Sequence, residues 1–226
     1  MARVLIIGGS DAGIAAALRA REVDPAADVT VAVADVFPNY SICGLPFYLS
    51  GEVPDWRALA HRTAAEIEGH GIALLLDHAA RAIDPVRRAV TVVDRDGRAH
   101  DLAYDRLVIA TGAVPIRPRI AGLDLPGVYT LHSMEDSFAV HARLAPDPAR
   151  AAVVIGGGYI GTEMADALTH RGLAVTLVEQ ASAVLTTVDP ALGALVGAEL
   201  GVMHTFDDAG WQPECDLLVR PPPTHV

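Results

Sequence analysis

The chain has 226 residues, of which 51% are hydrophobic and 20% are charged, a composition that supports a packed core and excludes extensive disorder. Its formal net charge of −11 argues against a nucleic-acid surface and against binding to an anionic membrane. All 17 basic residues are arginine, so chemistry that needs a lysine, such as a Schiff base, is excluded.

Hydropathy and cysteine content indicate the cellular setting. No run reaches the roughly 18 apolar residues of a membrane span, and a strand pattern starts almost at the N-terminus, so we expect neither a membrane segment nor a signal peptide. The two cysteines, Cys43 and Cys215, do not make a disulfide framework. We therefore expect a reducing cytoplasm, where a free cysteine is either a small core residue or a chemical one.

Short apolar runs alternate with helical stretches along the chain, which predicts an α/β fold. The expected strands cover 4–8, 29–34, 89–93, 100–104 and 107–110, and Asp96-Gly97 predicts a hairpin between the third and the fourth. The expected helices cover 13–21, 55–69 with Asp55 as N-cap, 133–144 with Ser133 as N-cap, and 189–200. We expect 36–54 to be irregular, and after residue 200 we recognise only a short strand at Asp216–Val219.

Two glycine-rich loops, each between an apolar strand and a helix, form the clearest motif. In such a loop the first glycine permits a tight turn, the second lets the backbone approach a pyrophosphate, and the third lets the helix pack close to the strand. The positions are Gly8, Ser10 and Gly13 in the first loop, and Gly156, Gly158 and Gly161 in the second. An ordinary glycine turn is the alternative for either loop alone, but two loops in register favour two nucleotide sites.

An acid follows each loop, after the next strand. Asp35 lies 27 residues after Gly8, and Glu179 lies 23 residues after Gly156, close to the spacing at which a carboxylate binds ribose hydroxyls. The sequence thus repeats one strand–loop–helix–strand–acid unit. Because Glu179 would repel a 2′-phosphate, NADH is favoured over NADPH.

Cys43 lies in a segment with a glycine and a proline beside it, eight residues after Asp35. A buried small hydrophobe is the ordinary state of a free cysteine. We favour a reactive thiolate, because the chain returns here from the ribose end of the first nucleotide toward its reactive end. Cys215 lies in a poorly patterned region, and we interpret it as incidental.

These residues resemble the flavin-dependent pyridine nucleotide–disulfide oxidoreductases, within them the single-cysteine branch that includes coenzyme A-disulfide reductase, NADH oxidase and NADH peroxidase. The resemblance covers roughly residues 1 to 200 and is most specific at Cys43-Gly44-Leu45-Pro46. It implies an α/β fold with two Rossmann-like three-layer units, incomplete at the C-terminus. It also implies FAD held by Gly8, Ser10, Gly13, Asp35, Thr111 and Gly112, and NADH held by Gly156, Gly158, Gly161 and Glu179, with Tyr159 over the nicotinamide, Glu163 near the flavin and Cys43 as electron acceptor.

The sequence departs from other branches of this family at single positions. Tyr48 stands where the dithiol branch has its second cysteine, which excludes an internal redox disulfide, and Asp11 replaces the histidine of the peroxidase branch. Ile42 and Glu22 replace an asparagine and an arginine that are common in coenzyme A reductases, which disfavours coenzyme A as substrate.

The expected organisation is 1–113 for FAD, 114–150 as linker and helix, 151–200 for part of the NAD-binding domain, and 201–226 as an irregular tail. The family's second flavin-binding stretch and its dimerisation domain are not recognised, which suggests a truncated or deleted copy with an exposed hydrophobic face. The leading interpretation is an oxidoreductase that reduces a small disulfide, a sulfur species or dioxygen. The alternatives are an inactive nucleotide-binding fragment and a ferredoxin-reductase-like flavoprotein in which Cys43 is incidental.

Overall fold

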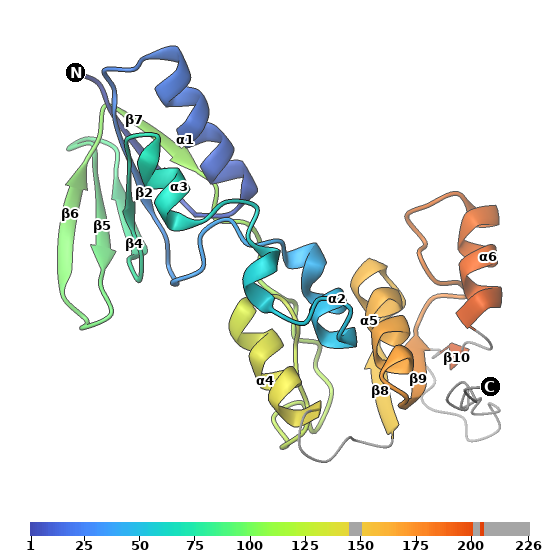
Figure 1. Cartoon of the computed structure of the whole chain (residues 1–226). Coiled ribbons are helices and arrows are strands. Elements are labelled where there is room, and N and C mark those ends of the chain that lie inside the picture. The colour runs from blue at the N-terminus through green and yellow to red at the C-terminus, as the bar shows by residue number, and fades with distance from the viewer. Residues whose placement is uncertain (145–150, 201–203, 206–226) are drawn as a thin grey trace. The chain divides into compact units, whose positions relative to one another are not determined.

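The computed structural model describes residues 1–144, 151–200 and 204–205 (Figure 1). Cys215 and the expected strand at Asp216–Val219 lie outside these described residues. The described chain forms two compact units. The first comprises Met1–Ile42 with Arg57–Pro118, and the second comprises Cys43–Trp56 with the described residues from Arg119 onward.

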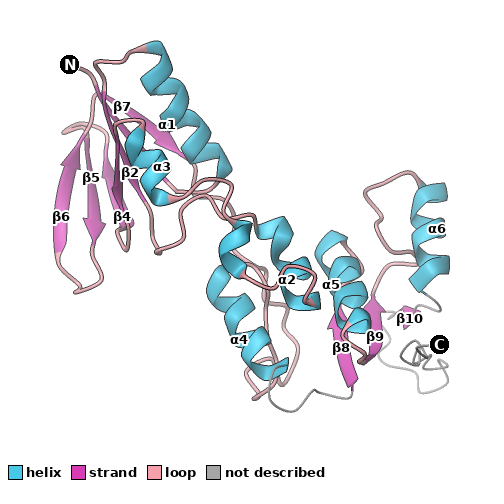
Figure 2. Ribbon diagram, viewed as in Figure 1, coloured by secondary structure: helices cyan, strands magenta, loops and turns pink. Residues whose placement is uncertain are grey.

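The first unit is built on a parallel sheet with the strand order β3-β2-β1-β7. Figure 2 shows the strands of this unit in magenta, with α1 and α3 in cyan. Its strands are β1 Arg3–Ile7, β2 Asp28–Ala32, β3 Ile72–Leu75 and β7 Arg106–Ile109. The strands predicted at 4–8, 29–34 and 107–110 are confirmed, each with a boundary shift of one or two residues. Their apolar runs suit a sheet that is covered on both faces.

Side chains alternate across this sheet and fill a separate core on each face. On one face, Ile6 packs with residues of β2 and of the helices α1 (Asp11–Val23) and α3 (Ala64–Gly69). On the other, Leu5 and Ile7 pack against a second sheet. The first unit therefore has the three-layer architecture that the resemblance predicts.

The second sheet of this unit is antiparallel, with the order β4-β5-β6. Its strands are β4 Ala79–Asp84, β5 Ala89–Val93 and β6 Ala99–Ala103, and the predicted hairpin joins the last two. The turn closes when Asp94 N–H donates to the carbonyl of Arg98, with Gly97 at φ 79°. Sequence reasoning missed β4.

The predicted helix from Asp55 to Gly69 is wrong. A 3₁₀ turn, η2, covers Trp56–Leu59, and α3 begins only after Thr63. Thr63 Oγ1 accepts from the N–H of Glu66, while a carboxylate oxygen of Glu66 accepts from the N–H of Thr63 at 2.7 Å. This reciprocal capping box starts a new helix, and the sequence analysis overlooked it.

The second unit contains a smaller parallel sheet, β10-β9-β8. Its strands are β8 Ala151–Ile155, β9 Ala174–Glu179 and the short β10 His204–Thr205, which lies within the tail expected to be irregular. The helix α5 (Tyr159–His170) packs on β8 and β9, and α6 (Pro190–Leu200) confirms the helix predicted there. Val153 and Ile155 on β8 are 66% and 59% exposed, so one face of this sheet is apolar and uncovered among the described residues.

Two further α-helices of the described chain belong to the second unit, α2 (Leu45–Ser50) and α4 (Met134–Leu144). A 3₁₀ turn, η1 (Ile42–Gly44), precedes α2 and starts at the last residue of the first unit's N-terminal segment. The expectation that 36–54 is irregular is therefore wrong for α2, which is too short for a periodic pattern and ends at Gly51 with φ 94°. Ser133 caps α4 as predicted, because its Oγ accepts from the N–H of Asp136 at 3.1 Å.

Candidate functional site

The first glycine loop joins β1 to α1 in a form that only glycine permits at two positions. Gly8 has φ 112° and donates its N–H to the carbonyl of Ala32 at 2.9 Å. A Cβ on Gly8 would overlap the carbonyl of Ala110, and one on Gly13 would overlap the carbonyl of Gly8. Gly8 thus closes the turn and Gly13 lets α1 start against the strand, as the sequence predicts.

The second loop repeats this geometry between β8 and α5. Gly156 has φ 105° and donates to the carbonyl of Val178 at 2.7 Å, and a Cβ on Gly161 would overlap the carbonyl of Gly156. Nothing lies within 4 Å of the position that a Cβ on Gly158 would take. That open side, beside the first N–H groups of α5, has the shape and polarity that a diphosphate requires.

The middle positions of the two loops adopt the same backbone conformation. Ser10 has φ −85° and ψ −170°, and Gly158 has φ −75° and ψ −172°. Both are exposed. A serine therefore replaces the usual glycine in the first loop without a change of the backbone, and both loops fit a dinucleotide.

Glu179 ends β9 and touches the second loop directly. Its carboxylate accepts from the N–H of Gly157 at 2.5 Å and from the N–H of Ala181 at 2.8 Å. Partial burial acts to raise the pKa of Glu179, but the backbone N–H groups outweigh it, so this pKa lies below its ordinary value. Each carboxylate oxygen has a further lone pair, so an ionised Glu179 can still accept from a ribose hydroxyl.

Asp35 does not occupy the position equivalent to Glu179, which corrects the prediction of one unit used twice. In the second loop Glu179 stands against Gly157, whereas in the first loop Val33 stands against Gly9. Asp35 lies two residues beyond Val33, and its Oδ1 accepts from the N–H of Phe37 at 2.8 Å. The first acid therefore belongs to the turn that follows β2.

Thr111 and Gly112 directly follow the residue that meets the first loop. The Cβ position of Gly8 abuts the carbonyl of Ala110 and the N–H of Thr111, so the end of β7 and the glycine turn are in close contact. Gly112 has φ 67°, which favours glycine. The structure thus brings Thr111 beside the first loop across about a hundred residues of chain.

Sequence reasoning missed a polar network at the same loop. Asn39 donates its N–H to the carbonyl of Gly9 and its Nδ2 to a carboxylate oxygen of Asp11, both at 2.7 Å. His61 Nδ1 lies 2.9 Å from that same oxygen. Asn39 is 1% exposed and has φ 57°. Its two hydrogen bonds hold the segment after β2 against the first loop. The one available signal was an asparagine, the residue that best tolerates a positive φ after glycine.

Cys43 lies on η1 and is exposed, so the alternative of a buried core cysteine is wrong. Tyr159 is the first residue of α5 and is 57% exposed, and Glu163, also exposed, lies one turn further on the same face of the helix. Cys43, Tyr159 and Glu163 all belong to the second unit, together with the second glycine loop. The residues predicted to hold FAD belong to the first unit.

Comparison with known proteins decides the family. The sequence model that describes the pyridine nucleotide-disulphide oxidoreductase family matches residues 2–202 of this chain. The chain belongs to this family.

Named members of the family show the same relationship. The chain is 35% identical over 182 residues to an NAD(P)H sulfur oxidoreductase (CoA-dependent) of Pyrococcus abyssi, covering 80% of this chain and 40% of that protein. It resembles the solved NAD-dependent persulfide reductase of A. fulgidus with a TM-score of 0.82 and 35% identity, covering 90% of this chain and 39% of the other. It also resembles the water-forming NADH oxidase of Lactobacillus brevis bound to NADH, with a TM-score of 0.83 and 29% identity over 91% of this chain and 46% of the other. The chain therefore spans less than half the length of these relatives.

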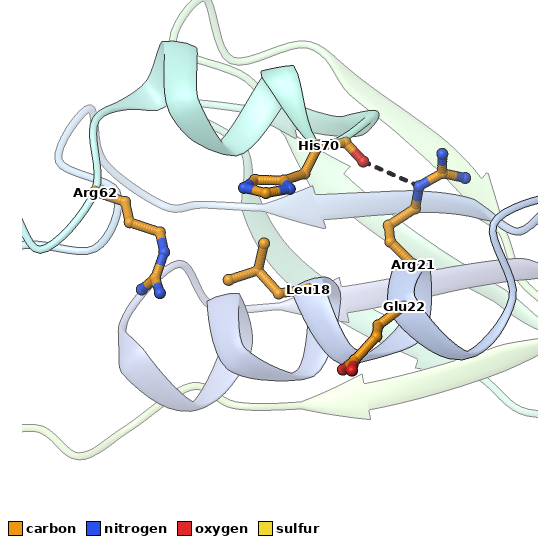
Figure 3. Close-up of a pocket in the computed structure, with 5 residues that line it drawn as sticks. All are labelled: Leu18, Arg21, Glu22, Arg62 and His70. Carbon is orange, nitrogen blue, oxygen red and sulfur yellow. Dashed lines mark hydrogen bonds between the residues drawn. The ribbon is translucent and has the colours of Figure 1, made fainter.

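A pocket of about 480 Å³ lies in the first unit, and none of the predicted site residues is among those that line it (Figure 3). It is lined by Leu18, Arg21, Glu22, Arg62 and His70. Arg21 donates to the carbonyl oxygens of His70, Pro25 and Ala27, so this arginine ties α1 to the neighbouring chain. Glu22 adds a carboxylate to the lining and pairs with Arg19 at 2.7 Å.

Two other kinds of site find no support among residues 1–144, 151–200 and 204–205. No group of three histidine, cysteine or acidic side chains there is arranged to hold a metal ion. No helix in these ranges has the length and apolar character to cross a bilayer.

Proposed function

We propose that the chain is an FAD-dependent oxidoreductase that uses NADH to reduce a small disulfide, a sulfur species or dioxygen through a single redox-active cysteine, Cys43. The observation that carries this proposal is the pair of glycine loops with equal backbone geometry in a chain that exposes Cys43. For a disulfide, NADH, one proton and the disulfide yield NAD⁺ and two thiols.

The first loop would hold the diphosphate of FAD through the N–H groups at the start of α1, with Gly8, Ser10 and Gly13 allowing its approach. The Thr111–Gly112 turn, which lies beside the first loop, would contact the adenosine half, whereas Asp35 is engaged in the turn that follows β2. When bound, FAD supplies the two-electron chemistry that links a hydride donor to a thiol. Asn39 and His61 support this site, because they hold Asp11 at the edge of the loop.

The second loop would hold NADH through Gly156, Gly158 and Gly161. Glu179 would accept from a ribose hydroxyl, and its negative charge would repel a 2′-phosphate, so NADPH is the weaker ligand. Tyr159 and Glu163 project from the first turns of α5, where they would cover the nicotinamide and face the flavin. The NADH complex of the Lactobacillus brevis oxidase supports this assignment.

The thiolate of Cys43 would attack a disulfide acceptor, which forms a mixed disulfide and releases one thiol, or would reduce an oxygen species and become a sulfenic acid. Bound FAD would supply the two electrons from NADH that return Cys43 to the thiolate. Tyr48 stands five residues later, so the residue that would close an internal disulfide is a tyrosine. Sulfur chemistry is favoured by the names of the Pyrococcus abyssi and A. fulgidus relatives. Glu22 and Ile42 disfavour coenzyme A itself.

The setting follows from the same properties. We infer a cytoplasmic protein with small-molecule partners, because the charge is −11 and the described helices include none that suits a membrane. The homodimer of the family depends on a domain that we do not recognise in this chain.

An anaerobic visible absorption spectrum before and after NADH tests the proposal. We expect a yellow protein whose flavin bands bleach on NADH addition, and loss of turnover with retained flavin in Cys43→Ser. A colourless protein that still binds NADH would identify an inactive nucleotide-binding fragment. Full turnover in Cys43→Ser would identify a ferredoxin-reductase-like flavoprotein with an incidental cysteine.

A further inference from the structure

The C-terminal ends of two helices of the second unit, α2 and α5, meet at Arg171. Arg171 follows α5 directly, and its Nε donates a hydrogen bond of 2.6 Å to the carbonyl of Leu49 in the last turn of α2. A Cβ on Gly51 would lie 3.9 Å from the guanidinium, so the charge covers the end of α2. The last carbonyls of a helix lack partners within the helix, and a cation there satisfies them and the helix dipole.

The helix that Arg171 holds is continuous with the turn that carries Cys43. η1 (Ile42–Gly44) runs without a break into α2 (Leu45–Ser50), and we call these nine residues the cysteine turn. The cysteine turn packs between α4 and α5 (Figure 2). The ring of Tyr48 stacks on His141 of α4, with 4.7 Å between the ring centroids and 15° between the planes.

The charge of Arg171 also reaches this aromatic pair. Burial raises the pKa of Tyr48, and Arg171 acts against that rise. Burial lowers the pKa of His141, and Arg171 adds to that decrease. The hydrogen bond to Leu49 places the guanidinium at the end of α2, where it can fix the cysteine turn from one side.

The opposite end of α5 begins at the second glycine loop. Tyr159 follows Gly158 directly, and the 12 residues of α5 span about 18 Å at 1.5 Å per residue. Thr162 Oγ1 donates to the carbonyl of Gly158 at 3.0 Å, which ties the first turn of α5 to the loop. One helix thus connects the nucleotide loop to the contact between Arg171 and α2.

We propose that Arg171 is a positioning residue for Cys43, which holds the cysteine turn on the far end of α5 and makes the reactivity of Cys43 depend on nucleotide occupancy at the second loop. The inference rests on the proposed function only in taking that loop as the nicotinamide nucleotide site. All of its contacts lie within one compact unit.

The rate of Cys43 alkylation by iodoacetamide, measured with and without saturating NAD⁺, tests the proposal. A Cys215→Ser background leaves Cys43 as the single reactive thiol, since the chain has two cysteines. In this background we expect NAD⁺ to change the rate at least threefold. In Arg171→Met we expect a severalfold higher rate without NAD⁺ and no effect of NAD⁺, because the cysteine turn is no longer tied to α5.

Two further variants separate positioning from general stability. Arg171→Lys should recover part of the NAD⁺ effect, because an ammonium can donate one bond to the carbonyl of Leu49 but lacks the planar fork of arginine. Arg19→Met, which removes an exposed arginine of α1, should behave as the background. If Arg171→Met matches the background in both its rate and its NAD⁺ effect, the proposal is overturned.

Hydrogen exchange of the unmodified chain covers the case in which Arg171→Met does not fold. The amides of Gly51 and Val53 donate to the carbonyls of Tyr48 and Phe47, and they should exchange more slowly when NAD⁺ is bound. Unchanged exchange contradicts the proposal. A colourless preparation would contradict the proposed flavin function, but the alkylation rate and the amide exchange could still be measured. An active flavoprotein in which Arg171→Met changes neither the alkylation rate nor its response to NAD⁺ would contradict this inference alone.

Discussion

The two units share a loop but differ in how their sheets are covered. In the first unit, β1 is buried toward its C-terminal end, with Ile6 fully buried and its neighbours packed on the opposite face. In the second, every other residue of β8 is exposed, including Val153 and Ile155. Equal loops on unequally covered sheets show that the loop geometry is set locally, whereas the stability of its base depends on the packing around it.

The largest difference should come from Gly13→Ala and Gly161→Ala. Each substitution places a Cβ on the backbone carbonyl of the first glycine of its loop, an overlap that no side chain can relieve. We expect a loss of about 4 kcal/mol for Gly13→Ala, because α1 is confined by a sheet packed on both faces. Gly161→Ala should cost about 2 kcal/mol, because a sheet covered on one face can bend away from α5.

Urea unfolding followed by circular dichroism would measure both losses. Gly69→Ala serves as the control for an added methyl without overlap, because Gly69 also lies in a helix without a positive φ and nothing lies within 4 Å of its Cβ position. Equal losses at Gly13 and Gly161 would show that the cover of the sheet does not matter to its loop.

Truncation of one apolar side chain in each central strand gives the next largest contrast. Ile6→Ala removes a fully buried side chain and should destabilise the chain by about 3 kcal/mol. Ile155→Ala removes a side chain that is 59% exposed and should change stability by less than about 0.5 kcal/mol. Unfolding curves of both variants would check this, and a large loss at Ile155 would mean that the face of β8 is covered in solution.

Glu179→Gln tests the role of the carboxylate that contacts Gly157 in the second loop, a position that Val33 occupies in the first loop. The substitution removes the charge that would repel a 2′-phosphate, so the preference for NADH over NADPH should fall about tenfold, or about 1.4 kcal/mol. Fluorescence titration with both nucleotides would measure it. Asp166→Asn, an exposed acid on α5, should leave the preference unchanged, and the assignment fails if both variants behave alike.

The pH dependence of the stability of the second loop follows from the lowered pKa of Glu179. Because this pKa lies below its ordinary value near 4.5 in the folded chain, the carboxylate stabilises the loop above that value. The stabilisation is lost as the pH falls through the lowered pKa. We expect the difference in urea stability between the unmodified chain and Glu179→Gln to persist down to about pH 4.5. A decline of this difference at a higher pH would contradict the hydrogen bonds to Gly157 and Ala181.

Much of the fold of both units could be predicted from the sequence, because the features that determine it are local in the chain. The glycine spacing, the strand runs and the Asp-Gly turn each lie within about ten residues, and the structure confirms them. The contact of Gly8 with Ala110 and the network around Asn39 join distant segments, and a single sequence carries no signal for such contacts. The roles predicted for Cys43, Tyr159 and Glu163 remain predictions, although the structure exposes all three.

The errors of the sequence analysis also have physical causes. The helix expected from Asp55 failed because a second capping residue, Thr63, begins a helix of its own eight residues later. α2 escaped recognition because six residues show less than two turns of periodicity. The equivalence of Asp35 and Glu179 failed because spacing alone does not determine which residue touches the loop.

The smallest expected effect compares the caps of two helices. Thr63 caps α3 in the first unit, and Asp189 accepts from the N–H of Ala191 at 2.8 Å at the start of α6 in the second. Replacement of either by alanine should cost its helix about 1 kcal/mol. Because Ile67 of α3 is fully buried in the core of the first unit, Thr63→Ala should lower the midpoint of global unfolding. The one buried residue of α6 is Gly193, which has no side chain. Asp189→Ala should therefore raise amide exchange within α6 and leave that midpoint unchanged. A shift of the midpoint in both variants would mean that the second unit is packed as cooperatively as the first.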